Sequence, residues 1–135
     1  MFVDANIAIA LLNVNDIHHT AAITRLSIEP DPKILSVTWG ESMIAAYAAG
    51  DRQATLAADL LDNAFERIDV DQRVVETAAR LRGTLVRKGI AARRLPMLDA
   101  LVVAAAVVHD DKLLTADTGW PTAELRVKRR VVVVA

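Results

Sequence analysis

Four acidic residues stand far apart in this chain of 135 residues, yet each occupies a place from which it would reach the same edge of a parallel β-sheet. They are Asp4, Glu41, Asp99 and Asp117. Asp4 directly follows an apolar run typical of a strand, and Asp117 lies two residues after another such run. Glu41 and Asp99 fall in the expected first turns of two helices that begin at that edge. We therefore expect the four carboxylates to meet in the crevice where such sheets bind ligands.

Carboxylates that gather in this way repel one another, and the repulsion is relieved when they share a divalent cation. Oxygen ligands favour Mg²⁺ or Mn²⁺, and the absence of cysteine removes thiolate ligands altogether. A divalent cation held by carboxylates suits phosphoryl chemistry, because it activates an attacking water and neutralises phosphate charge. Two nearby polar residues, Asn6 and Thr115, are candidates for adding a hydrogen bond to this cluster or for orienting a water.

Local sequence also offers an ordinary structural explanation for each acid. Asp4 and Asp99 are suitable helix N-caps, because aspartate is among the preferred capping residues. Glu41 is a typical solvent-exposed acid of a first helical turn, where the helix dipole favours it. Asp117, in the run Thr-Ala-Asp-Thr-Gly, suits a turn. Only the shared edge of the sheet favours a joint functional role.

The elements that would position these acids alternate regularly along the chain. Strands are predicted at residues 1–3, 33–36, 68–70, 112–115 and 131–134. Helices are predicted at residues 5–13, 16–28, 38–49, 51–67, 71–88 and 98–110. Strands separated by helices need crossover connections, so we predict one α/β domain over residues 1–135, with a mostly parallel sheet and helices on both faces. The last strand is β-branched throughout and is expected to be buried on both faces.

The composition fits a folded protein and excludes several classes. With 53% hydrophobic residues, the chain has enough apolar surface to offset the entropy of ordering. A net charge of −1 argues against a protein that holds nucleic acid by bulk positive charge. It is compatible with a local cluster of cations that binds nucleic acid. The lack of cysteine excludes a disulfide scaffold and a thiol nucleophile. No secretory signal is recognisable and no apolar run reaches the roughly 20 residues of a membrane span, so a cytoplasmic location is expected.

Four motifs, taken in order, resemble those of the PIN-domain nucleases. The motifs are Val3-Asp4-Ala5-Asn6, Ser36-Val37-Thr38-Trp39-Gly40-Glu41, the run from Leu95 to Ala106 that contains Asp99, and Leu113-Leu114-Thr115-Ala116-Asp117. Their order and spacing, together with the total length, look most like the VapC toxins of bacterial toxin–antitoxin pairs. The resemblance covers essentially the whole chain, and four motifs in order are far more specific than any one of them.

The resemblance implies a PIN-like three-layer α/β/α sandwich whose five-stranded parallel sheet has the order 3-2-1-4-5, with the first and fourth strands side by side. It implies an endoribonuclease that depends on Mg²⁺ or Mn²⁺, cuts cellular RNA, commonly tRNA or rRNA, and so inhibits translation. The family's catalytic and metal-binding positions map onto the four acids, and its polar partners map onto Asn6 and Thr115. Many relatives carry a further acid where this chain has Gly119, so a stable two-metal site is not expected.

Partners also follow from the resemblance. It implies a homodimer and a cognate VapB-like antitoxin that wraps the toxin and pushes a basic or aromatic side chain toward the acids. Helices between residues 16 and 67, rich in alanine, leucine and isoleucine, are the expected source of the apolar groove for that antitoxin.

Cations near the acids are needed to hold RNA phosphates, because the acids themselves repel RNA. Arg93 and Arg94 lie shortly before Asp99 and are the first candidates. Further candidates form a stripe with a seven-residue period along the long helix predicted at 71–88, namely Arg73, Arg80 and Arg87. The alternative for the stripe is an ordinary solvated helix face.

The remaining basic and aromatic features carry weaker signals. The dense basic run at 126–130 precedes the last strand, so it is expected at the opposite end of the sheet from the acids. His18, His19 and His109 lack partners at metal-ligand spacing and are interpreted as structural. Trp39 and Trp120 are interpreted as packing residues, with base stacking a minor alternative for Trp120.

Two other functions stay open at this point. A catalytically silent PIN-fold binding module would sequester RNA or an antitoxin without cutting. An acid-cluster phosphatase would act through a phospho-aspartate, but that chemistry usually needs a second aspartate two residues after the nucleophile, where this chain has Asn6. Cleavage that EDTA abolishes would separate the nuclease from the first, and a trapped phosphoryl-enzyme would favour the second.

Overall fold

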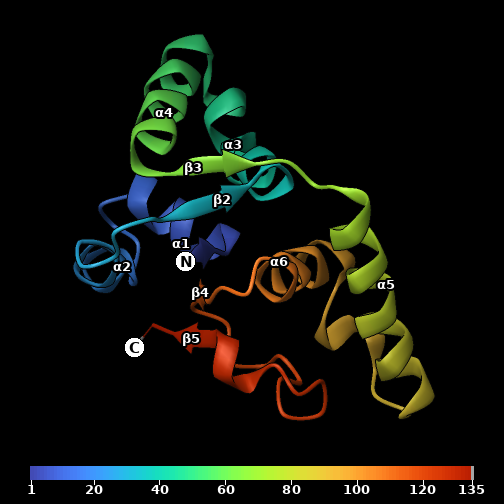
Figure 1. Cartoon of the computed structure of the whole chain (residues 1–135). Helices are drawn as coiled ribbons and strands as arrows, with labels where there is room; N and C mark the ends of the chain where they lie inside the picture. Colours follow the sequence, from blue (N-terminus) through green and yellow to red (C-terminus); the bar gives the residue numbers. More distant parts are fainter. Residues whose placement is uncertain (135) are drawn as a thin grey trace.

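Five short parallel strands form one sheet in the order β3-β2-β1-β4-β5 in the computed structural model, which describes residues 1–134 (Figure 1). The strands are β1 (Phe2–Val3), β2 (Lys33–Leu35), β3 (Glu66–Ile68), β4 (Leu113–Thr115) and β5 (Val131–Val133). The sheet is so twisted that the arrows of β3 and β5 point in opposite directions in Figure 1. The predicted fold class and strand order are confirmed.

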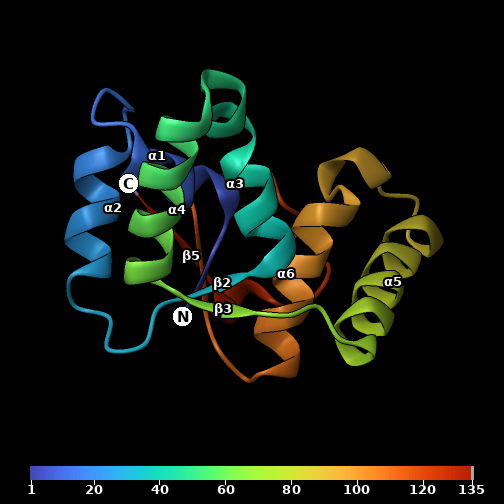
Figure 2. The same cartoon turned by 90° about the horizontal axis from the view of Figure 1, so that it is seen from above.

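Alternate residues of the strands divide the core into two layers, as period-two side-chain directions require. One face carries Phe2, Leu35 and Leu113, and the opposite face carries Val3, Ile34 and Leu114. The first face is covered by α5 (Gln72–Arg87) and α6 (Met97–Val108). The second is covered by α1 (Ala5–Leu12), α2 (His19–Leu26), α3 (Ser36–Ala49) and α4 (Asp51–Ala64). Figure 2 shows these two groups of helices on either side, which makes a three-layer sandwich.

The apolar helix α6 is the best example of a confirmed element. Its residues from Ala100 to Ala106 are all buried, because this helix packs between the sheet and α5. Within residues 1–134, no helix combines the length and apolar character that crossing a membrane requires.

Several helix boundaries differ from the prediction. The second helix begins at His19, because the Asp16 carboxylate accepts the His18 backbone N–H in a turn that precedes the helix. Gly50, with φ of 123°, separates α3 from α4, so Asp51 lies in the first turn of α4 and does not cap it. Asp71 does cap α5, where its carboxylate accepts the Val74 N–H at 2.9 Å.

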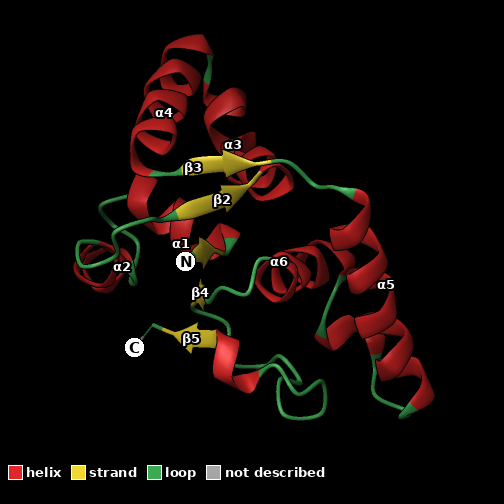
Figure 3. Cartoon of the chain, in the orientation of Figure 1, coloured by secondary structure: helices red, strands yellow, loops and turns green. Residues whose placement is uncertain are grey.

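Two strands also differ from the prediction. The third strand lies at Glu66–Ile68, two residues earlier than expected, because α4 ends at Ala64 and the buried Phe65 turns the chain into the sheet. The fifth strand is not buried on both faces, since it is an edge strand and Val133 is 44% exposed. Two 3-10 turns, η1 (Ala92–Arg94) and η2 (Lys128–Arg130), complete the fold (Figure 3).

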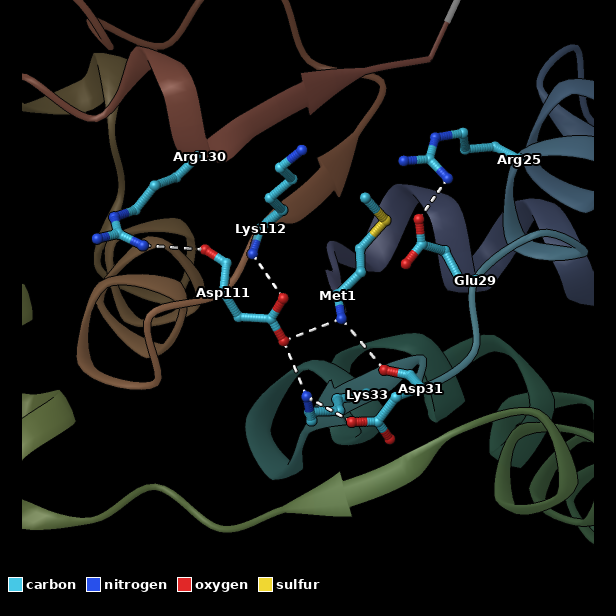
Figure 4. Close-up of polar contacts among 8 residues, drawn as sticks. All are labelled: Met1, Arg25, Glu29, Asp31, Lys33, Asp111, Lys112 and Arg130. Carbon is cyan, nitrogen blue, oxygen red and sulfur yellow. Dashed lines mark hydrogen bonds and ion pairs between the residues drawn. The ribbon is translucent and has the colours of Figure 1, made fainter.

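A network of charges ties the amino ends of the strands together (Figure 4). The Asp111 carboxylate accepts hydrogen bonds from the N-terminal ammonium of Met1 at 2.9 Å and from Lys33 Nζ at 2.8 Å. Burial alone would raise the pKa of Asp111, but the hydrogen bonds from Lys33 and the N-terminus outweigh it and lower the pKa to about 2. This carboxylate therefore joins the starts of β1, β2 and β4.

Replacing Asp111 with asparagine is expected to lower the free energy of unfolding by about 1–3 kcal/mol at pH 7, because two ammonium groups lose a charged acceptor. Since the folded pKa lies below the unfolded value near 3.8, the stabilisation is present above that value and is lost as pH falls through about 2. Urea unfolding at pH 7 and pH 3 measures both effects. Asp110→Asn is the matched control, because its exposed ion pair with Arg130 is worth less than about 1 kcal/mol. Equal losses in the two variants would contradict this account.

Candidate functional site

Asp4 and Thr115 are the centre of a hydrogen-bond network at the carboxyl ends of β1 and β4. The two strands pair with Val3 opposite Leu114, which sets the residues that follow them side by side. Asp4 is only 5% exposed, and its Oδ1 accepts the Ala5 backbone N–H at 2.8 Å as the N-cap of α1. Its Oδ2 accepts the Thr115 hydroxyl at 2.8 Å. Asp4 is thus a cap and also a member of a polar cluster.

Thr115 uses its full hydrogen-bonding capacity inside the protein. Besides donating to Asp4, its Oγ1 accepts the Asp117 backbone N–H at 3.0 Å and the Asn6 side-chain amide at 3.3 Å. The Asn6 carbonyl oxygen in turn accepts the Ala116 N–H at 3.1 Å. Because a hydroxyl has one donor and two acceptor sites, Thr115 has none left for a water. Of its two predicted roles, the structure therefore favours the added hydrogen bond.

Asp117 is exposed at the start of the loop that follows β4. Its Oδ1 accepts the Gly119 N–H at 2.7 Å, so it forms the turn expected from the local sequence. A Cβ atom at position 119 would approach that same oxygen to 3.3 Å. Position 119, where the resemblance led us to look for a further acid, is thus close to the Asp117 carboxylate.

Glu41 and Asp99 approach the cluster from two helices. Because α3 already begins at Ser36, Glu41 lies in its second turn and not in the first, as was predicted. Asp99 lies in the first turn of α6, but Pro96 occupies the N-cap position, so Asp99 is not a cap. Both acids are partly buried.

The four carboxylates lie close enough to perturb one another electrostatically. Burial is the main reason that the pKa of Asp99 rises to about 6, and the charges of Asp4, Glu41 and Asp117 raise it further. Burial likewise raises the pKa of Asp4, against the hydrogen bonds from Thr115 and Ala5, and the charges of Glu41 and Asp117 act in the same direction as burial. Four acids from distant parts of the sequence therefore share one electrostatic field.

No cation of residues 1–134 forms an ion pair with any of these four acids. The donor set, consisting only of carboxylate oxygens, fits a hard divalent cation such as Mg²⁺ or Mn²⁺. Over the same residues, no three side chains of histidine, cysteine, aspartate or glutamate stand at the spacing of a common metal ion. Binding a shared ion would thus require side-chain rotations, for which the exposed Asp117 has the most freedom.

The sequence analysis did not predict that two further polar groups would accompany the acids. The Trp120 indole is 6% exposed, and its N–H has no hydrogen-bond partner of normal geometry in the described part of the chain. It nevertheless faces Asp99 and offsets a small part of the rise in the pKa of that carboxyl. The buried Thr38 hydroxyl, in the first turn of α3, also lacks a partner there. Thr38 belongs to the 36–41 motif, so that motif was the available signal.

The candidate RNA-binding arginines fall into two groups. Arg94 is close to the acids, because its Nη2 donates to the Gly119 carbonyl at 3.3 Å, and Arg93 is exposed beside it on η1. Arg80 instead lines a hollow with Val107 and Val108, at the end of α6 opposite to Asp99. Arg87 is exposed at the C-terminal end of α5.

An apolar groove of about 690 Å³ opens between α1, α3 and α4. Its lining includes Ile9, Ile44, Leu56 and Leu60, all of which are at least 40% exposed. Glu41 also lines it, so the groove reaches the acid cluster. The structure places this groove largely in the helices expected to supply one, with α1 as an addition. We refer to it below as the α1–α3–α4 groove.

Two of the three histidines, and also Trp39, have local structural partners. His19 Nδ1 lies 2.6 Å from the Ala10 carbonyl oxygen, and the His109 ring packs 5.5 Å from that of Phe2. The Arg67 guanidinium stacks over Trp39 at 3.9 Å.

A twisted parallel sheet of order 3-2-1-4-5, with carboxylates at its switch point, defines a class of α/β/α proteins whose ligand site lies at the carboxyl edge. The family model of the PIN domain matches residues 1–124 of this chain. The protein therefore belongs to the PIN domain family. No curated protein matches it.

Solved structures with the same fold include several toxins. A toxin–antitoxin complex from Klebsiella pneumoniae is 25% identical, with a TM-score of 0.74, and the match covers 98% of this chain and 95% of that one. VapBC2 from Rickettsia felis, bound to a DNA fragment from its promoter, is 17% identical, with a TM-score of 0.74 and coverage of 99% and 98%. VapC20 from Mycobacterium tuberculosis, a toxin that cleaves the sarcin–ricin loop, is 23% identical, with a TM-score of 0.71 and coverage of 90% and 93%.

Proposed function

We propose that this protein is a metal-dependent endoribonuclease and the toxin of a toxin–antitoxin pair, which acts in the cytoplasm and inhibits translation by cutting tRNA or rRNA. The observation that carries the proposal is the group of four mutually repelling carboxylates with no ion-pair partner in residues 1–134. Such a group is costly to the protein unless it serves a cation. The membership in the PIN domain family and the similarity to the Klebsiella pneumoniae complex support the same reading.

The metal ligands in this proposal are Asp4, Glu41, Asp99 and Asp117. Mg²⁺ or Mn²⁺ would supply Lewis-acid activation of water and neutralise charge on the scissile phosphate. Thr115 and Asn6 hold the Asp4 carboxylate and the backbone at Asp117 in place through the network described above. A carboxylate of the cluster accepts a proton from the attacking water. Attack in line on the phosphorus then breaks the bond to the 3′-oxygen, which takes up a proton from solvent, and the products are a 5′-phosphate and a 3′-hydroxyl.

Substrate phosphates require cations around this acidic centre. Arg93 and Arg94 are the nearest candidates, because Arg94 contacts the Gly119 carbonyl in the loop that carries Asp117. Arg80 and Arg87 on α5 lie farther from the acids and are proposed to contact more distant phosphates.

The proposed partner is a VapB-like antitoxin that occupies the α1–α3–α4 groove. The groove is mostly apolar and Glu41 is part of its lining, so a segment bound there would bring a basic or aromatic side chain to the acids. Complexes of this type are the form in which the Klebsiella pneumoniae and Rickettsia felis relatives were solved. A homodimer of this chain is part of the same proposal.

Metal removal tests the nuclease function directly. Purified protein is incubated with total cellular RNA and Mg²⁺ or Mn²⁺, and the new 5′ ends are mapped. We expect discrete cleavage sites that disappear with EDTA and return when excess divalent ion is added. RNA that stays intact with both ions, although the protein binds it, would favour the silent binding module instead.

A further inference from the structure

A second charged region lies at the amino edge of the sheet, opposite to the carboxylates. It is a cavity of about 870 Å³ whose lining holds six basic and three acidic side chains, in a chain with a net charge of only −1. The basic residues are Arg25, Lys112, Arg126, Lys128, Arg129 and Arg130, and the acidic ones are Glu29, Asp110 and Asp111. We call this region the basic cavity.

The acids of the basic cavity already have partners. The Asp111 carboxylate is bound by the Met1 ammonium and by Lys33, neither of which lines the cavity. Glu29 pairs with Arg25 (Figure 4). Asp110 pairs with Arg130 at 3.0 Å.

Four cations of the cavity consequently have no ion-pair partner in residues 1–134. They are Lys112, Arg126, Lys128 and Arg129. All four are exposed, on two segments that face one hollow, so their charge is available to an external anion.

The connection between β4 and β5 joins this cavity to the acid cluster. The segment 116–130 between β4 and β5 begins beside Asp117 and ends in η2, which lines the cavity (Figure 3). Two exposed cations donate hydrogen bonds to backbone carbonyl groups of this segment. Arg94 donates to Gly119 at 3.3 Å and Lys88 Nζ donates to Glu124 at 2.8 Å. Positive charges therefore accompany the connection from one edge of the sheet to the other.

We propose that the basic cavity is a second RNA site, which binds backbone phosphates of the same RNA that is cut at the carboxylates. This inference rests on the proposed nuclease function. The helix α6 spans about 14 Å from Asp99 to Val108, at 1.5 Å per residue, and so separates the two edges. A folded RNA can bridge that distance. The alternative of an anionic membrane is less favoured, because a membrane site needs apolar anchors and the cavity lining is mostly charged.

The double variant Lys128→Glu/Arg129→Glu tests this proposal. Its matched control is Arg52→Glu/Arg67→Glu, which makes the same change of net charge at exposed positions of α4 and β3 outside the cavity and outside the arginine stripe of α5. Binding of a labelled 20-nucleotide RNA hairpin is measured in EDTA by fluorescence anisotropy, over a range of salt concentrations. We expect the cavity variant to bind at least about 10-fold more weakly than the control, with a salt slope smaller by about 1.5, because each phosphate contact contributes about 0.7–0.9.

Lys112→Glu, on the other segment of the cavity, is a second variant that should weaken hairpin binding by a smaller factor in the same direction. Hairpin affinity that is equal in cavity and control variants would overturn the proposal, as would wild-type protein that does not bind the hairpin. Loss of binding to phosphatidylserine vesicles with unchanged RNA binding would assign the cavity to a membrane instead. Because binding is measured without metal, this outcome is independent of whether the wild-type protein cleaves RNA.

Discussion

Asp4→Asn is expected to lower RNA cleavage at least about 1,000-fold and to leave the protein folded. The loss follows because a metal site stabilises the transition state by several kcal/mol and each 1.36 kcal/mol is tenfold in rate. The fold should survive, since the asparagine Oδ1 still accepts the Ala5 N–H of the N-cap and only the hydrogen bond from the Thr115 hydroxyl is lost. Initial rates of cleavage with saturating Mn²⁺, together with thermal unfolding, measure the two quantities.

The same substitution at an aspartate outside the cluster shows whether the loss of cleavage depends on where the charge is removed. Asp59→Asn removes one exposed carboxylate of α4 outside the cluster and should cleave at the wild-type rate. Asp99→Asn should resemble Asp4→Asn, because its carboxylate shares the same field. Calorimetry should also detect weaker Mn²⁺ binding by both cluster variants. Wild-type rates in Asp4→Asn and Asp99→Asn would reject the assignment of the active site.

Charged substitutions in the α1–α3–α4 groove are expected to prevent capture by the antitoxin. In the double variant Ile44→Glu/Leu56→Glu, two side chains that are 67% and 61% exposed become charged, so the fold of the free protein should persist. We expect the affinity for the antitoxin to fall at least about 100-fold, because each central apolar contact of an interface contributes about 2 kcal/mol. The partner to test is a VapB-like antitoxin sought as a short reading frame next to this gene, with affinity measured by calorimetry.

Exposed apolar residues outside the groove provide the control for that experiment. Val75→Glu/Val86→Glu changes two such positions on α5 and should leave antitoxin binding intact. Co-expression in cells gives an independent readout, since the groove variant should remain toxic in the presence of the antitoxin whereas the control should be neutralised. Equal binding by the two double variants would show that the antitoxin uses another surface.

The chain's local patterns contain enough information for the layers of this fold but not for every boundary. Apolar runs separated by amphipathic helices predicted a parallel sheet. The regular alternation of strands and helices left few other ways to arrange the elements. The third strand was wrong by two residues, because residues 66–70 alternate weakly and only pairing with β2 selects Glu66–Ile68. The fifth strand was wrong in its burial, since valines favour a strand without stating whether it lies at the centre or the edge.

The candidate site, like the fold, was predictable from the sequence only in part. The identity of the four acids and their shared edge follow from the sequence, because each acid is tied to the end of a strand or the start of a helix. Tertiary packing alone decided that Thr115 is saturated by Asp4, Asn6 and Asp117, since these bonds join residues more than 100 positions apart as well as near neighbours. It also set the groove beside Glu41 and the basic cavity at the far edge, because both are gaps between elements whose spacing no local pattern records.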